Sequence, residues 1–330
     1  MRNQLQNRCD IFVQNRNVIK DEFGWENSYI YPLCASLYTS KNILADTAQM
    51  RACLDLLKDK TGIFSNFRST SKMATVTMLS LSNQPEESLD NLLNVYSALK
   101  EIFWGSEYLT VAASIIVNMA APSQYHDVVA RTRMIYDRMK VAHPYLASRE
   151  DAPFAALLAL SELDDVHIED EMEQCYVLCK PSFFSGNAVQ SLSHALALGN
   201  RPAQEKCRRV IEIYDRLKSA GYKYGKSYEL PTLGVLALLD VDTALLCEDI
   251  MQVDDYLRGQ SGFGPLGIGA RQRLMYAGIL TMDDYIPETK TMELASINSV
   301  VSLVIAQQAA ICAAIVAASA AAAASSSSSN

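Results

Sequence analysis

The chain has 330 residues, 49% hydrophobic and 20% charged, a composition typical of a folded protein and unlike that of a disordered one. The net charge of −8 argues against a nucleic-acid-binding protein, which needs a basic face to neutralise phosphates. Only 14 glycines and 10 prolines are present, and this scarcity favours helices over a turn-rich β fold.

The first 23 residues contain no apolar core segment of the kind that a signal peptide carries. We therefore expect a cytoplasmic protein whose eight cysteines are reduced thiols.

Apolar stretches of eight to twelve residues recur along the chain and predict buried helices, termed A helices here. They occupy residues 28–38, 73–82, 109–119, 154–161, 189–199, 230–239 and 271–282. From the second stretch on, most follow a short segment that contains aromatic residues, such as GIFSNF, IFWGSEY and HPYLAS. Pro153 and Pro231 each precede a matching leucine by the same interval, and this position suits the first turn of a helix, where a missing N–H costs nothing.

Amphipathic stretches alternate with these and predict a second set of helices, termed B helices. Each ends in a similar phrase, and the copies are CLDLLK, VYSALK, IYDRMK, CYVLCK, IYDRLK and VDDYLR. Their last residues are Lys58, Lys100, Lys140, Lys180, Lys218 and Arg258, in steps of 42, 40, 40, 38 and 40 residues. In this phrase we expect the tyrosine to pack into the next hairpin and the lysine to meet the negative end of the helix.

A period near forty residues is typical of stacked helical hairpins, none of which can bury its apolar face alone. The sequence therefore predicts an all-α protein of stacked antiparallel hairpins, either an open α-solenoid or a closed α/α toroid. We expect one continuous repeat domain over residues 1–318 and a disordered Ala/Ser tail over residues 319–330.

The segments SYIYPLCASLYTS, GIFSNFRSTSKMATVTMLSLS, SGNAVQSLSHALALG, YELPTLGVLALLDVD and GFGPLGIGARQRLMYAGIL carry a resemblance to a known family. In these segments the chain is similar to the bacterial family called domain of unknown function 4003. The likeness covers nearly the whole chain and implies one continuous domain. It implies no activity and no catalytic residue.

Polar residues at the starts of the A helices form the candidate ligand-binding or catalytic set. If these helices converge, their N-terminal ends would ring one mouth of a central space, where helix dipoles favour anions. The set is Arg68, Ser69, Glu107, Arg149, Glu150, Asp151, Asn187, Tyr228, Glu229, Arg271 and Arg273. The competing interpretation is helix capping and solvated loops, because residues 148–151, SRED, match a capping box.

Other motifs point more weakly to chemistry. Cys175 and Cys179 have a spacing that could bind a metal, but they occupy repeat positions filled elsewhere by aliphatic residues, so we expect packing and no metal or cofactor. GFGPLG, residues 262–267, matches a dinucleotide fingerprint, but it follows a repeat helix, and we expect a flexible loop. His194 lies inside a buried stretch and is interpreted as a core histidine.

Residues 294–330 contain no charged side chain, and residues 300–318 are apolar enough to span a membrane. Gln307 and Gln308 interrupt that segment, and its large aliphatic residues follow one helical face. We expect a helix that closes the array and packs on the domain, with a membrane anchor as the alternative.

Two functions follow from these observations. The first is a non-catalytic scaffold that binds a protein or peptide on its concave face, as helical repeats commonly do. The second is a small-molecule-binding protein or enzyme that uses the polar starts of the A helices.

Overall fold

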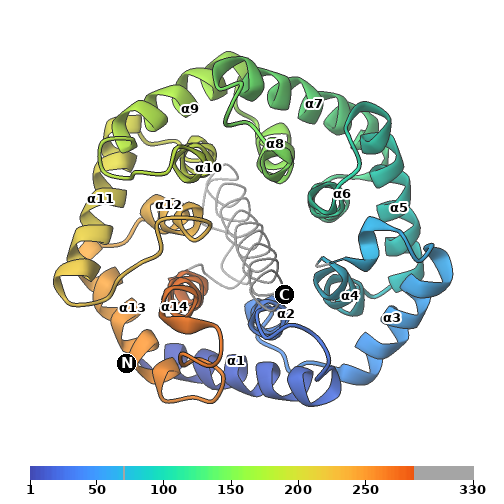
Figure 1. Ribbon diagram of the computed structural model, residues 1–330, viewed down its shortest axis with the longest axis horizontal. Helices are drawn as coiled ribbons and strands as arrows, with labels where there is room; N and C mark the ends of the chain where they lie inside the picture. Colours follow the sequence, from blue (N-terminus) through green and yellow to red (C-terminus); the bar gives the residue numbers. More distant parts are fainter. Residues whose placement is uncertain (70, 286–330) are drawn as a thin grey trace, which may run out of the picture. The chain divides into compact units, whose positions relative to one another are not determined.

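The computed structural model describes residues 1–69 and 71–285. Over these residues the chain is helical, with fourteen α-helices, three short 3₁₀ helices and no strand (Figure 1). The prediction of an all-α protein is confirmed. The predicted closing helix, membrane anchor and Ala/Ser tail all lie outside the described residues.

The chain divides into two compact units. One is the 14–162 unit, and the other comprises residues 163–285 together with residues 1–13 and is called the 163–285 unit. Helix α1 (Asn3–Glu22) belongs to the 163–285 unit up to Val13 and to the 14–162 unit from Gln14 onward.

The 14–162 unit is built of two rows of helices. The A helices α2 (Ile30–Ser40), α4 (Lys72–Ser80), α6 (Glu107–Met119) and α8 (Ala152–Leu160) pack in chain order, each on the next. The B helices α3 (Thr47–Lys60), α5 (Pro85–Ile102) and α7 (Tyr125–Ala142) form the second row, α3 against α5 and α5 against α7. The 3₁₀ helices are η1 (Asn66–Arg68), η2 (Pro122–Gln124) and η3 (Arg149–Asp151).

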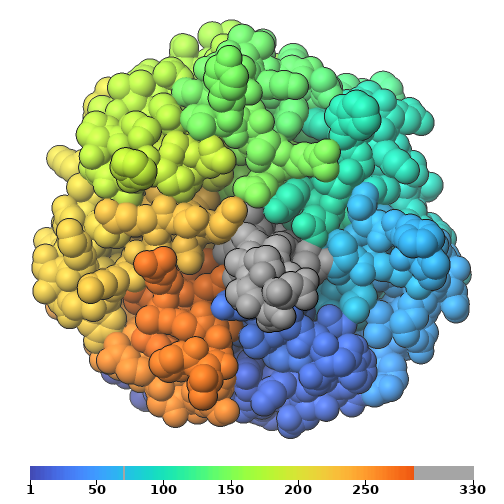
Figure 2. All heavy atoms as spheres, in the orientation of Figure 1, coloured from blue at the N-terminus to red at the C-terminus, as the bar shows by residue number. Residues whose placement is uncertain are grey.

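The 163–285 unit repeats this arrangement. The A helices are α10 (Gly186–Ala197), α12 (Leu230–Leu238) and α14 (Gly269–Tyr285), and α12 packs against both of the others. The B helices α9 (Asp165–Cys179), α11 (Ala203–Ser219) and α13 (Thr243–Arg258) form the row beside them. In the space-filling view the hairpins of this unit lie beside one another in chain order (Figure 2).

Burial explains why the two sets of helices differ in sequence. In α8 every residue from Ala152 to Ala159 is buried, and α12 is buried from Leu230 to Ala237. The B helix α11 instead buries one stripe that includes Cys207, Val210 and Leu217. An all-round apolar helix is stable only when neighbours cover it on every side, so the hydrophobic pattern assigns each helix to its row. Pro153 and Pro231 lie in the first turns of α8 and α12, as predicted.

Three of the B helices, α3, α9 and α13, begin at aspartates that cap exposed N–H groups. Asp164 accepts hydrogen bonds from the backbone N–H groups of Val166 and His167, and Asp242 accepts them from Ala244 and Leu245. Such caps satisfy donors that have no partner within the helix. In these turns an aspartate therefore marks, in the sequence itself, where the B helix begins.

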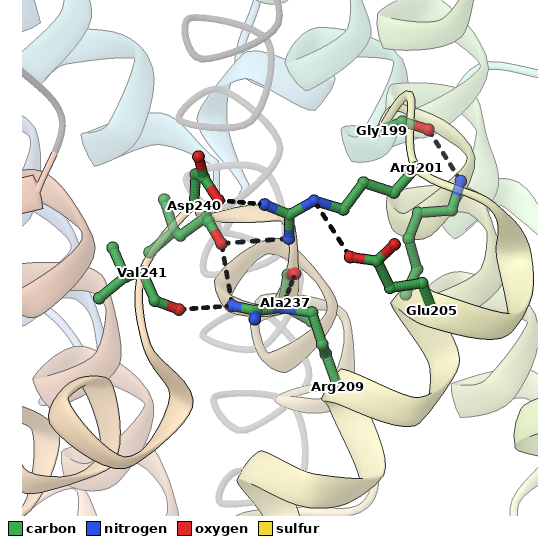
Figure 3. Close-up of polar contacts among 9 residues, drawn as sticks. Gly199, Arg201, Glu205, Arg209, Ala237, Asp240 and Val241 are labelled. Atoms are coloured by element: carbon green, nitrogen blue, oxygen red, sulfur yellow. Dashed lines mark hydrogen bonds and ion pairs between the residues drawn. The ribbon is translucent and has the colours of Figure 1, made fainter.

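The C-terminal ends of A helices are held by basic side chains from B helices. Arg209 on α11 donates to the carbonyl oxygens of Ala237 (3.0 Å), Leu239 (2.9 Å) and Val241 (2.8 Å) at the end of α12 (Figure 3). Arg201 adds an ion pair with Asp240 at 2.6 Å. These contacts satisfy carbonyl groups at the negative end of the helix dipole.

Basic side chains also contact the C-terminal ends of other A helices. Arg131, which precedes Lys140 by as many residues as Arg209 precedes Lys218, donates to the carbonyl oxygens of Ala159 (2.9 Å) and Ser161 (2.7 Å) at the end of α8. At the end of α10 the fully buried Lys206 donates to the carbonyl oxygen of Gly199 and pairs with Glu171, both at 2.8 Å. In each case a buried helix end depends on a cation from the neighbouring row.

The first part of α1 packs with the last two described helices. Arg2 pairs with Asp249 at 2.7 Å and with Asp284 at 2.9 Å. The ring of Phe12 lies 5.6 Å from that of Phe263 and 5.7 Å from that of Tyr276. The 163–285 unit is thus completed by residues from the opposite end of the sequence.

Replacing Arg209 by alanine tests the importance of these helix-end contacts. We expect Arg209→Ala to lower the free energy of unfolding by about 1–3 kcal/mol, because three carbonyl groups lose a charged donor. The urea midpoint monitored by circular dichroism measures this loss. The neighbouring Arg208 is exposed and serves as the matched control, so equal midpoints for Arg209→Ala and Arg208→Ala would contradict the prediction.

Candidate functional site

The predicted site residues do lie at or beside the starts of the A helices, but they fall into two sets. Arg68, Glu107 and the η3 residues belong to the 14–162 unit. The others belong to the 163–285 unit, and they are Asn187, Tyr228, Glu229, Arg271 and Arg273. The two sets are therefore considered separately.

Two of the predicted ligand-binding arginines have internal partners. Arg68 donates to the carbonyl oxygens of Lys58 and Thr61 and so holds the end of α3. Arg273 is 7% exposed and donates to both carboxylate oxygens of the buried Asp254, at 2.8 and 3.1 Å. Both guanidinium groups therefore make hydrogen bonds within the protein.

The acidic residues near α6 and α8 accept hydrogen bonds from neighbouring hydroxyl groups. Glu107 accepts a hydrogen bond from the hydroxyl of Ser69 at 3.2 Å, and Glu150 accepts one from Tyr108 at 3.3 Å. Burial raises the pKa of Glu150, and the neighbouring Asp151 and Glu107 carboxylates raise it further. Asp151 is buried and accepts the backbone N–H of Ser148 at 2.8 Å, which confirms the capping box.

In the 163–285 unit, Glu229 lies close to the chain before α12. It is 9% exposed, and a Cβ atom at Gly225 would come within 2.3 Å of its carboxylate, so a larger residue there would displace the Glu229 side chain. Tyr228 is 42% exposed, whereas Asn187 and Arg271 are exposed at the first turns of α10 and α14. These residues do not line the cavity described below.

A cavity of about 220 Å³ lies within the 14–162 unit, beside the starts of α6 and α8. It is lined by Phe103, Trp104, Ser106, Leu109, Arg133, Tyr136, Lys140, Ala147, Ser148, Arg149 and Ala152. Of the predicted site residues only Arg149 is among them. We refer to this space as the α6–α8 cavity.

Sequence analysis missed Tyr136 and Lys140, although both belong to the repeated phrase YDRMK. Tyr136 packs edge-on against Phe103 with ring centroids 5.1 Å apart, and Lys140 is exposed at the cavity wall. The tyrosine therefore contacts the loop that leads into α6 and not only the core. The signal that could have found this site is the phenylalanine that follows two of the phrases by three positions, Phe103 after Lys100 and Phe183 after Lys180.

The same aromatic pair occurs at two further places. Phe67 and Tyr96 have centroids 4.8 Å apart in the 14–162 unit, and Phe183 and Tyr214 have centroids 5.4 Å apart in the 163–285 unit. At the latter pair the ammonium of Lys226 lies 5.6 Å from the Phe183 ring and 4.7 Å from the Tyr214 ring.

Large apolar side chains are exposed on the loops that lead into the A helices, called lead-in loops here. In the 14–162 unit Trp25 is 66% exposed, Phe64 95%, Trp104 85% and Tyr145 98%, one in each loop before α2, α4, α6 and α8. Exposed aromatic residues that recur in this way mark a contact surface more often than single exposed residues do.

The seven cysteines among residues 1–69 and 71–285 are buried. Burial raises the pKa of Cys34 to about 12, while hydrogen bonding to Cys207 and burial together raise the pKa of Cys175. Within residues 1–69 and 71–285 no group of three or more His, Cys, Asp or Glu residues is placed to hold a metal ion.

GFGPLG follows helix α13, not a strand, and a Cβ at Gly267 would meet the carbonyl oxygen of Gly262 at 1.9 Å. In the same described ranges no helix is long and apolar enough to cross a bilayer.

The fold defines an all-α protein of packed helical hairpins. A model of the family described as Protein of unknown function (DUF4003) matches residues 15–309, and the chain belongs to that family. The chain is similar to the uncharacterized protein YeaA of Bacillus subtilis strain 168, with 23% identity over 303 residues that cover 88% of each chain. No solved structure matches the chain.

Substitution of two arginines in α14 separates structural from ligand-binding roles among the predicted site residues. We expect Arg273→Ala to lower the free energy of unfolding by about 1–3 kcal/mol, because the buried Asp254 loses two charged hydrogen bonds and keeps only its pair with the more exposed Arg258. The exposed Arg271→Ala should stay within about 0.5 kcal/mol of the wild type. Denaturation midpoints measure both, and a normal midpoint for Arg273→Ala would return that residue to the ligand-binding set.

Proposed function

We propose that this protein is a non-catalytic, cytoplasmic scaffold of stacked helical hairpins, which binds a protein or peptide segment. In this proposal the hairpins form a repeat with a period near forty residues, as an open solenoid or a closed toroid. The observation that carries the proposal is the regular exposure of one large aromatic side chain on each lead-in loop of the 14–162 unit.

The proposed contact surface differs from the concave face that the sequence suggested. The A helices expose little, since α8 and α12 are buried along nearly their whole length. The lead-in loops expose Trp25, Phe64, Trp104 and Tyr145, residue types that dominate binding energy at protein interfaces. We therefore place the partner on the lead-in loops.

The order of packing supports a continuous surface within this unit. Helices α2, α4, α6 and α8 follow one another side by side, and each is preceded by its own lead-in loop. A bound segment that crossed these loops would meet an aromatic side chain at each hairpin. Side chains on such loops can vary without disturbing the buried helices, which suits a binding function.

The double variant Phe64→Ser, Tyr145→Ser tests this proposal. Peptides are selected against the wild-type protein from a random library, and their dissociation constants are measured by calorimetry. Each hot-spot aromatic is worth about 2 kcal/mol or more, so we expect the double variant to lose at least about 4 kcal/mol of binding free energy.

The matched control is Val177→Ser, which removes an apolar side chain of 58% exposure from the B helix α9. It should leave peptide affinity unchanged. Selected peptides that bind the double variant as tightly as the wild type would place the contact elsewhere and contradict the proposal.

A further inference from the structure

The charge on the α6–α8 cavity is opposite in sign to that of the chain. Three charged side chains line it, Arg133, Lys140 and Arg149, and all are basic, whereas the chain as a whole has a net charge of −8. No carboxylate is among the lining residues. A basic concave site on an acidic protein indicates a negatively charged ligand.

The three cations differ in how far they are neutralised. Arg133 donates to the carboxylate of Asp137 at 2.8 Å and lies 5.1 Å from the centroid of Phe103. Lys140 and Arg149, by contrast, have no ion-pair partner among residues 1–69 and 71–285. Two positive charges at the cavity therefore remain uncompensated.

Ser106 supplies a second and independent sign of a ligand. It is 8% exposed, lines the cavity, and its hydroxyl has no hydrogen-bond partner within the described ranges. Ser106 is the N-cap residue of α6, yet its side chain makes no capping bond. Buried hydroxyl groups are nearly always paired, so this one is available to a bound molecule at the positive end of a thirteen-residue helix.

Aromatic rings form the rest of the wall. Phe103 and Tyr136 pack edge-on, and Trp104 is 85% exposed beside them. Rings of this kind stack on planar groups and exclude water from nearby charges.

We propose that the α6–α8 cavity binds a phosphate monoester attached to a planar ring. Arg149 and Lys140 bind the phosphate oxygens, and the hydroxyl of Ser106 donates to one of them. Trp104 packs on the ring. A phosphate monoester carries a charge of about −1.5 to −2 near neutral pH, which matches two free cations. The volume of about 220 Å³ suits a small ligand.

The corresponding aromatic pair in the 163–285 unit provides a comparison with the α6–α8 cavity. Phe183 and Tyr214 correspond to Phe103 and Tyr136 in the repeat, but the Lys226 ammonium lies over both rings. At the corresponding pair in the α6–α8 cavity the cation is Arg133, whose guanidinium lies 5.1 Å from the centroid of the Phe103 ring. Lys218, the counterpart of Lys140, provides a matched control.

The experiment uses the full-length chain and phenyl phosphate as the probe. In a Trp25→Phe background Trp104 is the only tryptophan, and its fluorescence reports binding at the cavity itself. Calorimetry gives the affinity. Phenol, benzoate and inorganic phosphate are titrated in parallel, to separate the contributions of ring, single charge and phosphate.

We expect phenyl phosphate to bind with a Kd of about 1 mM or tighter and to bind more tightly than each of the three other probes. Arg149→Ala and Lys140→Ala should each weaken it by about tenfold or more, and Ser106→Ala by about fivefold, since each removes a donor to the phosphate. Lys218→Ala should change nothing. Arg149→Lys keeps the charge and the fold and should lose less affinity than Arg149→Ala.

Several results would overturn the assignment. They are the absence of phenyl phosphate binding to the wild type, equal affinity for phenol or benzoate, and an equal loss in Lys218→Ala and Lys140→Ala. Because these variants leave Phe64 and Tyr145 intact, peptide binding at the lead-in loops succeeds or fails independently.

Discussion

The buried carbonyl ends of the A helices are the constraint on which the packing depends. A helix covered on all sides, such as α8 or α12, cannot expose its last carbonyl groups to water. Arg131, Lys206 and Arg209 reach from B helices to these ends, so each pair of rows is joined by charge as well as by apolar contact. Because the cation lies on the neighbouring B helix, an A helix can bury its C-terminal end only when that B helix is in its native position.

Sequence predicted those features that local chemistry determines. The apolar stretches, the prolines in the first turns of α8 and α12, and the capping box at Ser148 each follow from a helix's own residues. Arg273 was placed in a ligand-binding set because it lies near a helix start, but its partner Asp254 belongs to the preceding helix. A charge near a helix end has many possible partners, and only the packing selects one.

The α6–α8 cavity was missed for a related reason. Tyr136 and Lys140 belong to a phrase that recurs along the chain, and recurrence indicates a structural role. Tyr136 packs against Phe103 as Tyr214 packs against Phe183, and Tyr136 also lines the cavity, so one residue can have both a packing role and a place in a cavity wall.

The division of α1 has a consequence for the order in which the chain can fold. Arg2, Asp10 and Phe12 are made first, but Asp10 hydrogen-bonds to Tyr256, which is 246 residues later in the chain. At about 5–20 residues per second on the ribosome, this interval corresponds to roughly 12–50 s. For that time Phe12, which is fully buried in the folded protein, has neither Phe263 nor Tyr276 to pack against. The 14–162 unit can form during synthesis, whereas residues 1–13 can pack into the 163–285 unit only after the last hairpin of that unit has been synthesised.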